Sequence, residues 1–311
     1  MAYIKAFGAC LPDRVVTNQE IAARLGVEAD WILNASGIAE RRFAADGEEV
    51  EDLAVGAAQD CLKRSRAEAG SIGMLIVATG SAARRFPGPA AVVASRLGLS
   101  NAACLDLPMA SAGSLFGLAV AQSLAPQFGD VLVVGAEKMS AIAMQEPLDR
   151  NTSMLFGDGS GACLVSAQSG AAEILGTCLR SDGSFAGDLA LVWGSPLKMN
   201  GPVVILQASR KIPSVIEEVC RRQGVAPTSV DAFLMHQANL NLIVRVAGAL
   251  AVPPERFYSN IRRYGNTSSA SMLIAACEWS ENAGFRAGVP VVFAGFGAGF
   301  HWGAVLAVGK G

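Results

Sequence analysis

A serine in a long uncharged stretch is the first residue whose setting suggests chemistry. Residues 107–129 hold no charged side chain, and within them a strand-like segment gives way to a helical pattern at about Ser111. A helix N-terminus presents unpaired N–H groups and the positive end of the helix dipole, which stabilise an oxygen atom that gains negative charge. Gly113 and Gly117 would let other backbone approach closely. The simpler interpretation is that Ser111 only caps the helix, because serine is a preferred N-cap residue.

A histidine and an asparagine stand at comparable places further along the chain. His236 directly follows the apolar run 232–235, and ligands of α/β proteins bind at such carboxyl ends of strands. Asn266 lies in a glycine turn before an apolar helix. The loop 295–300 (GFGAGF) has backbone N–H groups that can face a ligand, but no helix follows it, so it is not a dinucleotide fingerprint. Each residue also has a structural interpretation, since an isolated histidine is usually structural and asparagine often caps a helix.

Alternating strands and helices must position these residues. The patterns predict strands at 3–9, 73–79, 103–107, 131–135, 161–167, 173–179, 232–235, 289–294 and 301–308. They predict helices at 20–25, 29–36, 50–69, 88–97, 111–124, 203–223, 240–250 and 268–283. The alternation of strands and helices occurs twice along the chain, which favours a parallel α/β architecture made of two similar halves, residues 1–167 and 168–311.

The composition limits the class of protein. The 311 residues are 51% hydrophobic and only 17% charged, which predicts a large core and a buried oligomer interface. The net charge of −2 gives no reason to expect a nucleic-acid partner. Seven cysteines without a Cys-x-x-Cys pair, and only two histidines, argue against a disulfide framework and against a metal site. The N-terminus does not have the layout of a signal peptide, and prolines and glutamines interrupt the uncharged stretch, so we expect a cytoplasmic protein that does not enter a membrane.

Taken together, the motifs resemble those of the β-ketoacyl-acyl-carrier-protein synthase III family. The shared segments, in family order, are residues 31–38, 106–113, 156–161, 236–240 (HQANL), 265–268 (GNTS) and 297–303. The pair HQAN and GNTS is specific to this branch of the thiolase superfamily, and the resemblance runs from Tyr3 to Val308. It implies an α/β, thiolase-like, five-layered α-β-α-β-α fold from two similar halves. It also implies a homodimeric acyltransferase that uses acyl-CoA as a substrate and needs no cofactor or metal.

The resemblance also assigns catalytic roles. The family has a cysteine at the position of Ser111, which takes the acyl group from acyl-CoA. His236 and Asn266 match the residues that bind the malonyl thioester carbonyl and stabilise the enolate formed as carbon dioxide leaves. The backbone N–H groups of Ser111 and Ala298 match the oxyanion hole, where donors placed in advance stabilise the developing charge most.

Five further residues match substrate-binding positions. Trp31 and Arg150 resemble the pair that stacks on the adenine of CoA. Gly201 and Asn239 match positions near the pantetheine arm. Phe86 resembles the residue that reaches across the dimer and lines the partner's acyl pocket.

Serine in place of cysteine is the main departure from the family. A thiol at a helix N-terminus ionises readily, whereas a hydroxyl needs a general base, for which His236 is the candidate. An acyl-serine ester is also less reactive toward a carbanion than a thioester is. Our first expectation is therefore acyl transfer in fatty-acid, polyketide or specialised-metabolite biosynthesis. Two alternatives stay open, a decarboxylating synthase III whose cysteine has been mutated to serine, and a catalytically silent subunit that supports a partner condensing enzyme.

Other departures concern the carrier protein and the pocket. The family docks an acidic acyl carrier protein on basic residues, whose positions here hold Leu206, Asn241, Gly248 and Ala249. Arg245 is the basic residue that remains nearby, so we expect docking to be weaker or placed differently. Segment 187–201 is shorter than the family's loop at the mouth of the site, which predicts a more open pocket. His301 replaces a small hydroxyl residue, and we expect it to be structural.

Overall fold

The computed structural model describes residues 1–310. The strands are β1 (Tyr3–Cys10), β2 (Arg14–Thr17), β3 (Glu40–Phe43), β4 (Ile72–Ala78), β5 (Ala103–Leu107), β6 (Asp130–Lys138), β7 (Asp158–Ser166), β8 (Ala172–Ser181), β9 (Leu189–Ala190), β10 (Lys198–Met199), β11 (Ala232–Met235), β12 (Phe257–Tyr258), β13 (Pro290–Gly297) and β14 (His301–Gly309). The α-helices are α1 (Asn18–Leu25), α2 (Ala29–Ser36), α3 (Val50–Ser65), α4 (Pro89–Arg96), α5 (Gly113–Phe128), α6 (Ser140–Ala143), α7 (Arg150–Ser153), α8 (Gly201–Arg222), α9 (Leu240–Ala249), α10 (Ile261–Tyr264) and α11 (Ser271–Asn282). Short 3₁₀ turns are η1 (Ala69–Ser71), η2 (Gly183–Phe185), η3 (Pro227–Ser229), η4 (Pro254–Arg256) and η5 (Ser268–Ala270).

The strand order reveals two equivalent halves. Ten strands are hydrogen-bonded in the order β12-β11-β13-β14-β8-β1-β7-β6-β4-β5. Outward from β1, the first half has β1, β7, β6, β4 and β5, which are its first, fifth, fourth, second and third strands along the chain. Outward from β8, the second half has β8, β14, β13, β11 and β12, which is the same order. The halves meet where Tyr3 and Ile4 of β1 pair with Glu173 and Ala172 of β8. We propose the boundary between residues 167 and 168, in the connection between β7 and β8.

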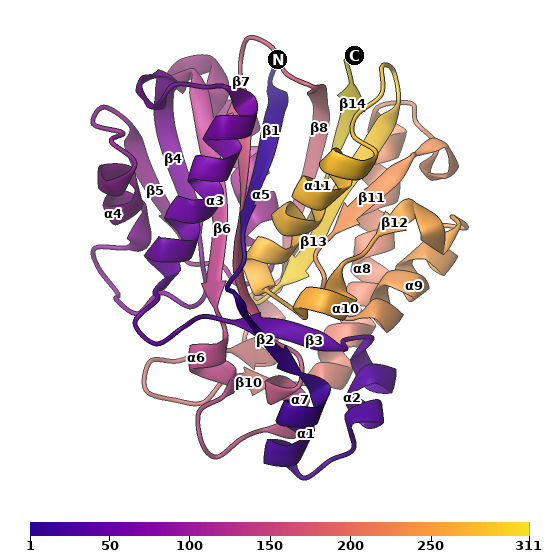
Figure 1. Ribbon diagram of the computed structural model, residues 1–311. Helices are drawn as coiled ribbons and strands as arrows, with labels where there is room; N and C mark the ends of the chain where they lie inside the picture. The colour runs from indigo at the N-terminus through magenta and orange to yellow at the C-terminus, as the bar shows by residue number, and fades with distance from the viewer. Residues whose placement is uncertain (311) are drawn as a thin grey trace.

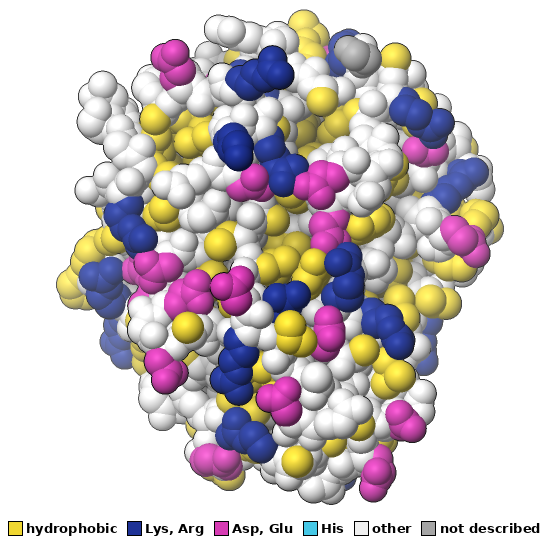
Figure 2. All heavy atoms as spheres, viewed as in Figure 1, with side chains coloured by type: hydrophobic (Ala, Val, Ile, Leu, Met, Phe, Trp, Pro, Cys, Tyr) yellow, Lys and Arg dark blue, Asp and Glu magenta, His cyan; other side chains and the backbone are white. Residues whose placement is uncertain are grey.

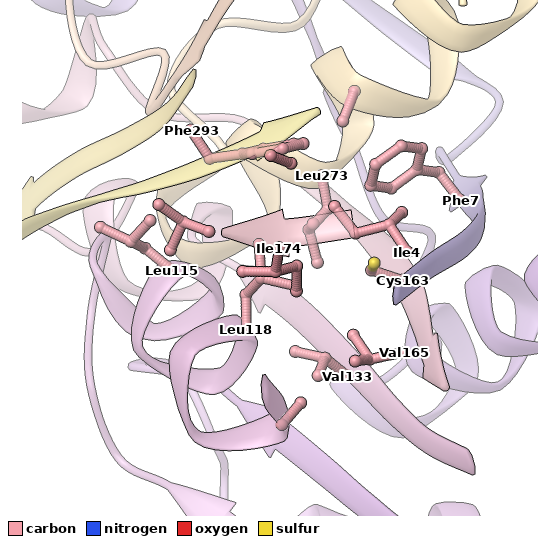
Figure 3. Close-up of a cluster of buried hydrophobic side chains, with 14 of the residues drawn as sticks. Ile4, Phe7, Leu115, Leu118, Val133, Cys163, Val165, Ile174, Leu273 and Phe293 are labelled. Carbon is pink, nitrogen blue, oxygen red and sulfur yellow. The ribbon is translucent and has the colours of Figure 1, made fainter. Parts of the chain in front are cut away.

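Helices α5 and α11 form the central layer of five. Both pack against strands of the two half-sheets, while α3 and α4 cover the outer face of one half-sheet and α8 and α9 cover that of the other (Figure 1). Leu115 and Leu118 of α5 belong to one buried cluster with Val133 of β6, Leu273 of α11 and Phe293 of β13, so the cluster joins both half-sheets to the central helices (Figure 3). A helix enclosed on all sides must be apolar around its whole circumference, which accounts for the uncharged stretch 107–129.

A smaller lobe lies below the ends of the strands. It contains β2, β3, α1, α2, α6, α7 and the β9–β10 pair, whereas both chain termini lie at the opposite end of the molecule (Figure 1). Its core includes Ile32 and Phe43, together with Leu155 and Phe156 from the segment before β7. The sequence patterns missed most of these elements, because two to four residues carry too little periodicity to be recognised.

Several helix boundaries differ from the sequence expectation by one to four residues. Helix α3 ends at Ser65 rather than at residue 69, because Arg66 adopts a left-handed conformation with φ of 53°. Helix α5 begins at Gly113, so Ser111 precedes it. The expected helix 268–283 begins as the 3₁₀ turn η5 and becomes α-helical only at Ser271.

The described surface carries charges of both signs. On the face drawn in Figure 2, lysine and arginine side chains are interspersed with aspartate and glutamate. In residues 1–310, no helix is both long and apolar enough to cross a bilayer. The seven cysteines are all free thiols, and of them only Cys104 is exposed.

Candidate active site

One apolar cavity collects the residues that the sequence marked for chemistry. Its volume is about 110 Å³, and Ser111, His236 and Asn266 all line it. The remaining lining residues are mostly hydrophobic: Ala110, Met139, Leu155, Phe156, Leu189, Leu197, Met199, Gly201, Val204, Ile205, Ala208, Ile212, Ala238, Asn239, Leu242, Ser268, Phe296 and Gly297. Polar groups gathered in an otherwise apolar cavity are typical of a small-molecule site.

Ser111 occupies the turn between β5 and α5 and does not cap the helix. Its φ is +64°, and the N-cap position is held by Ala112, which makes no side-chain capping bond. Only four non-glycine residues of the described chain have positive φ, and Ser268 of the same cavity is another of them. Such strained conformations persist where surrounding structure enforces them, and they concentrate at functional sites. Ser111 Oγ has no hydrogen-bond partner among residues 1–310, so any contact with a base has to form when substrate binds.

His236 lies at the carboxyl end of β11 and is almost completely buried. Its backbone N–H donates to the carbonyl of Ala294 at 2.9 Å, which fixes the residue beside β13. Burial lowers the pKa of the imidazole from its usual 6.5 to about 4, and the carbonyl of Ser268 opposes this only in part. His236 is therefore neutral at neutral pH, with one ring nitrogen available as a base.

We assign the ring proton of His236 from the surrounding hydrogen bonds. The hydroxyl of Ser271 donates to the carbonyl of Ser268 at 3.0 Å and accepts from the N–H of Gln237 at 3.0 Å. Nδ1 of His236 lies 2.6 Å from the same oxygen, and with the hydroxyl proton assigned to the carbonyl of Ser268, Nδ1–H is the donor. Nε2 then carries the free lone pair.

Asn266 is held in one orientation. Its side-chain Oδ1 accepts from the backbone N–H of Ser268 at 2.9 Å, which leaves the Nδ2 amide group as the donor that can serve the cavity. Its own backbone pairs with the segment before β7, because the N–H of Asn266 donates to Leu155 at 2.9 Å and its carbonyl accepts from Gly157 at 3.1 Å. An amide fixed at both its backbone and its Oδ1 can donate without reorganisation.

The glycine loop packs directly on the turn of Ser111. A Cβ atom on Gly297 would lie 2.2 Å from the carbonyl oxygen of Ala110 and 3.1 Å from Cβ of Ser111, so only glycine fits there. Gly297 lines the cavity, whereas Ala298, the residue expected in the oxyanion hole, is half-buried and is not among its lining residues. The N–H of Ser111, the other expected oxyanion donor, points to Oγ of Ser268 at 2.9 Å.

The predicted substrate residues divide into two groups. Gly201 and Asn239 line the cavity, and Asn239 also caps α9 by accepting from the N–H of Asn241 at 2.8 Å. Trp31, Arg150 and Phe86 lie outside it: Trp31 and Arg150 are exposed in the smaller lobe, and Phe86 is 85% exposed.

Several residues that line the cavity or contact His236 were not predicted from the sequence. Ser268 lines the cavity and Ser271 holds His236, although both follow closely on Asn266 in the motif that the sequence singled out. Val204, Ala208 and Ile212 form a wall of the cavity, and their spacing of four along α8 was a readable signal of one helix face. Leu189 and Leu197 contribute from segment 187–201.

His301 is not among the residues that line the cavity. Nδ1 of His301 lies 2.7 Å from Oγ of Ser181 on the neighbouring strand, and the ring packs edge-on against Phe116. Within residues 1–310, no group of three or more histidine, cysteine, aspartate or glutamate side chains is arranged to hold a metal ion.

Known proteins are similar to this chain in both sequence and fold. Two family models match, described as 3-oxoacyl-[acyl-carrier-protein (ACP)] synthase III over residues 105–183 and as its C-terminal part over residues 220–308. A beta-ketoacyl-[acyl-carrier-protein] synthase III from Gloeobacter violaceus is 38% identical over 96% of each chain. The crystal structure of 3-oxoacyl-[acyl-carrier-protein] synthase III from Aquifex aeolicus superposes with a TM-score of 0.95, at 32% identity, over 99% of this chain and 100% of the other. The priming β-ketosynthase of the R1128 polyketide pathway superposes with a TM-score of 0.92, at 28% identity, over 100% of this chain and 97% of the other.

Proposed function

The chain belongs to the 3-oxoacyl-[acyl-carrier-protein] synthase III family of acyltransferases, and we propose that it accepts an acyl group from acyl-CoA onto Ser111. The reaction would serve fatty-acid, polyketide or specialised-metabolite biosynthesis. The observation that supports it most is the convergence of Ser111, His236 and Asn266 on one apolar cavity. Apolar walls suit an acyl chain, and the three polar groups suit attack on a thioester.

The proposed acylation uses His236 as a general base. Nε2 takes the hydroxyl proton of Ser111 as Oγ forms a bond to the thioester carbonyl carbon. The C–S bond then breaks, and the departing sulfur takes the proton from Nε2, so that CoA leaves as a thiol and His236 returns to its neutral form. The Nδ2 group of Asn266 donates to the carbonyl oxygen, whose negative charge grows in the transition state. The product is an acyl ester on Ser111.

A second candidate is the decarboxylating condensation that the relatives' names indicate. Asn266 with its free Nδ2 donor suits the enolate that decarboxylation forms. However, Nε2 of His236 bears no proton in the assigned hydrogen-bond network, so it suits a base better than an enolate donor. This favours acyl transfer, with condensation as the activity expected of a cysteine variant.

The proposed partners follow from the same family membership. The substrate is acyl-CoA, with Trp31 and Arg150 on the adenine and Gly201 and Asn239 along the pantetheine arm. No cofactor takes part in these steps. We propose a homodimer in which Phe86, 85% exposed on the single chain, closes the partner's acyl pocket. Burial of this side chain against a second copy would remove its apolar surface from water, which favours association.

Intact-protein mass spectrometry tests the proposal directly. Incubation with a panel of acyl-CoAs should add one acyl mass to the wild-type chain and none to Ser111→Ala. Peptide mapping should place the group on Ser111. Malonyl-CoA decarboxylation without any acyl adduct would support the condensing alternative instead. Unchanged pathway output in cells that carry Ser111→Ala, together with a stable hetero-complex, would support the silent-subunit alternative.

A further inference from the structure

Ser268 is the one polar cavity residue that the proposed acylation leaves without a role. It lines the cavity, is 1% exposed and has φ of +47°. It precedes α11 as Ser111 precedes α5, so the two strained serines stand at corresponding turns of the two halves. A strained, buried serine at this place needs an explanation beyond packing.

The hydrogen bonds of Ser268 leave one proton unassigned. Its backbone N–H donates to Asn266 Oδ1 at 2.9 Å, and its carbonyl accepts from the hydroxyl of Ser271 at 3.0 Å. Its Oγ accepts from the N–H of Ser111 at 2.9 Å. A hydroxyl has one proton to donate, and no residue of the described chain accepts that of Ser268. The Ser268 hydroxyl is therefore a donor without an acceptor in the described chain, and Ser268 lines the cavity.

We propose that the Ser268 hydroxyl is a catalytic hydrogen-bond donor to the thioester carbonyl oxygen, an inference that rests on the proposed acyl transfer. The N–H of Ser111 points at Ser268 Oγ and not into open space, so it acts on the substrate through this hydroxyl. A hydroxyl that accepts a hydrogen bond becomes a stronger donor, because hydrogen bonds in a chain polarise one another. No covalent bond to Ser268 forms or breaks.

The orientation of Asn266 supports this donor pair. The N–H of Ser268 holds Oδ1 of Asn266, so Nδ2 and the Ser268 hydroxyl belong to one rigid unit built from consecutive turns. Two preset donors for one oxygen match the needs of a thioester carbonyl whose charge grows during attack. The unit departs from an oxyanion hole made of backbone N–H groups alone.

Removal of the hydroxyl tests the inference. Ser268→Ala should lower the single-turnover acylation rate about 100-fold, the usual loss for one oxyanion donor. Affinity for free CoA, which has no thioester carbonyl, should stay within about twofold. Ser268→Gly removes the same hydroxyl and relieves the positive φ, so it covers the case in which the alanine variant folds poorly.

Ser114→Ala is the matched control. Ser114 Oγ is buried near the same turn, has no hydrogen-bond partner in the described chain and does not line the cavity. Its removal should leave acylation unchanged. If wild type and Ser114→Ala are acylated and both Ser268 variants react equally fast, the role of Ser268 is overturned while the proposed function stands. If wild type forms no acyl ester, the proposed function is overturned, and the role of Ser268 with it.

Discussion

Nδ1 of His236 lies 2.6 Å from Oγ of Ser271, and the direction of this hydrogen bond sets which ring nitrogen is free to act as a base. When Ser271 donates its own proton to the carbonyl of Ser268, it accepts from the ring and leaves Nε2 as the base that we propose. The usual partner of a catalytic histidine is a carboxylate, which would stabilise the imidazolium. A neutral hydroxyl orients the ring without raising its pKa.

Replacement of Ser271 by alanine should disturb the orientation of His236 more than the fold. We expect the acylation rate to fall about 10-fold or more, because the ring loses the acceptor that selects its tautomer. Ser271→Thr keeps the hydroxyl and should restore most of the rate. Nitrogen NMR should show Nδ1 protonated in wild type and a mixed signal in the alanine variant. With only two histidines in the chain, His301→Gln assigns the spectrum. An unchanged tautomer in Ser271→Ala would refute the role of this residue.

The pH dependence of acylation should reflect the buried imidazole. The pKa of His236 is about 4 in the folded state against 6.5 in the unfolded chain. The base therefore stays unprotonated from pH 8 down to about pH 5, and acylation should fall only as the pH approaches 4. The free energy of unfolding should also fall as the pH is lowered. Between pH 6.5 and 4 the unfolded chain gains a proton on this histidine and the folded chain does not, so stability is lost through that range. A single-turnover profile with its midpoint near 6.5 would contradict this.

Exchange of Ser111 for cysteine should convert the reaction. The thiol at this turn ionises more readily than a hydroxyl, and its thioester is more reactive toward a carbanion. We expect Ser111→Cys to condense acyl-CoA with a malonyl thioester, measured as β-ketoacyl product. Wild type should accumulate the acyl ester with little condensation. Ser111→Ala, assayed alongside, gives the background.

A methyl group at Gly297 should push the glycine loop away from Ser111. Gly297→Ala places Cβ 2.2 Å from the carbonyl oxygen of Ala110, which overpacks a close contact between two backbones. We expect a loss of about 1–3 kcal/mol in the free energy of unfolding and a loss of acylation. Gly248→Ala is the control, because its Cβ meets no atom within 4 Å in α9. Replacing an exposed helical glycine by alanine should add about 0.5–1 kcal/mol. Thermal melts of both variants make the comparison.

The role of Trp31 can be separated from that of the cavity. If Trp31 stacks on the adenine of CoA, Trp31→Ala should raise KM for acyl-CoA by about 10-fold or less, in keeping with one stacking contact. KM for the acyl-pantetheine, which lacks the nucleotide, should not change. Trp31→Phe keeps an aromatic face and should stay close to wild type. An equal rise in KM for both substrates would place Trp31 outside the nucleotide site.

Most of the fold could be predicted from local patterns. The ranges of α2, β5 and β11 coincide with the sequence expectation, because apolar periodicity and end signals such as Gly37 at a φ of 80° are local properties. The short strands β2 and β3 could not be anticipated, since they exist only because they pair with each other. The start of α5 was misplaced for a related reason. The conformation of Ser111 is imposed by the glycine loop packed upon it, which lies far away in the sequence.

The sequence by itself predicted Ser111, His236 and Asn266 as the residues that do chemistry, from residue types, motif order and their places at strand ends, and all three line one cavity. The tertiary structure decided how they can act. The tautomer of His236, the free Nδ2 of Asn266 and the unassigned proton of Ser268 all depend on hydrogen bonds between neighbouring turns. Hydrogen-bond direction is a property of distances and of competing acceptors, and those exist only after the two halves have packed together.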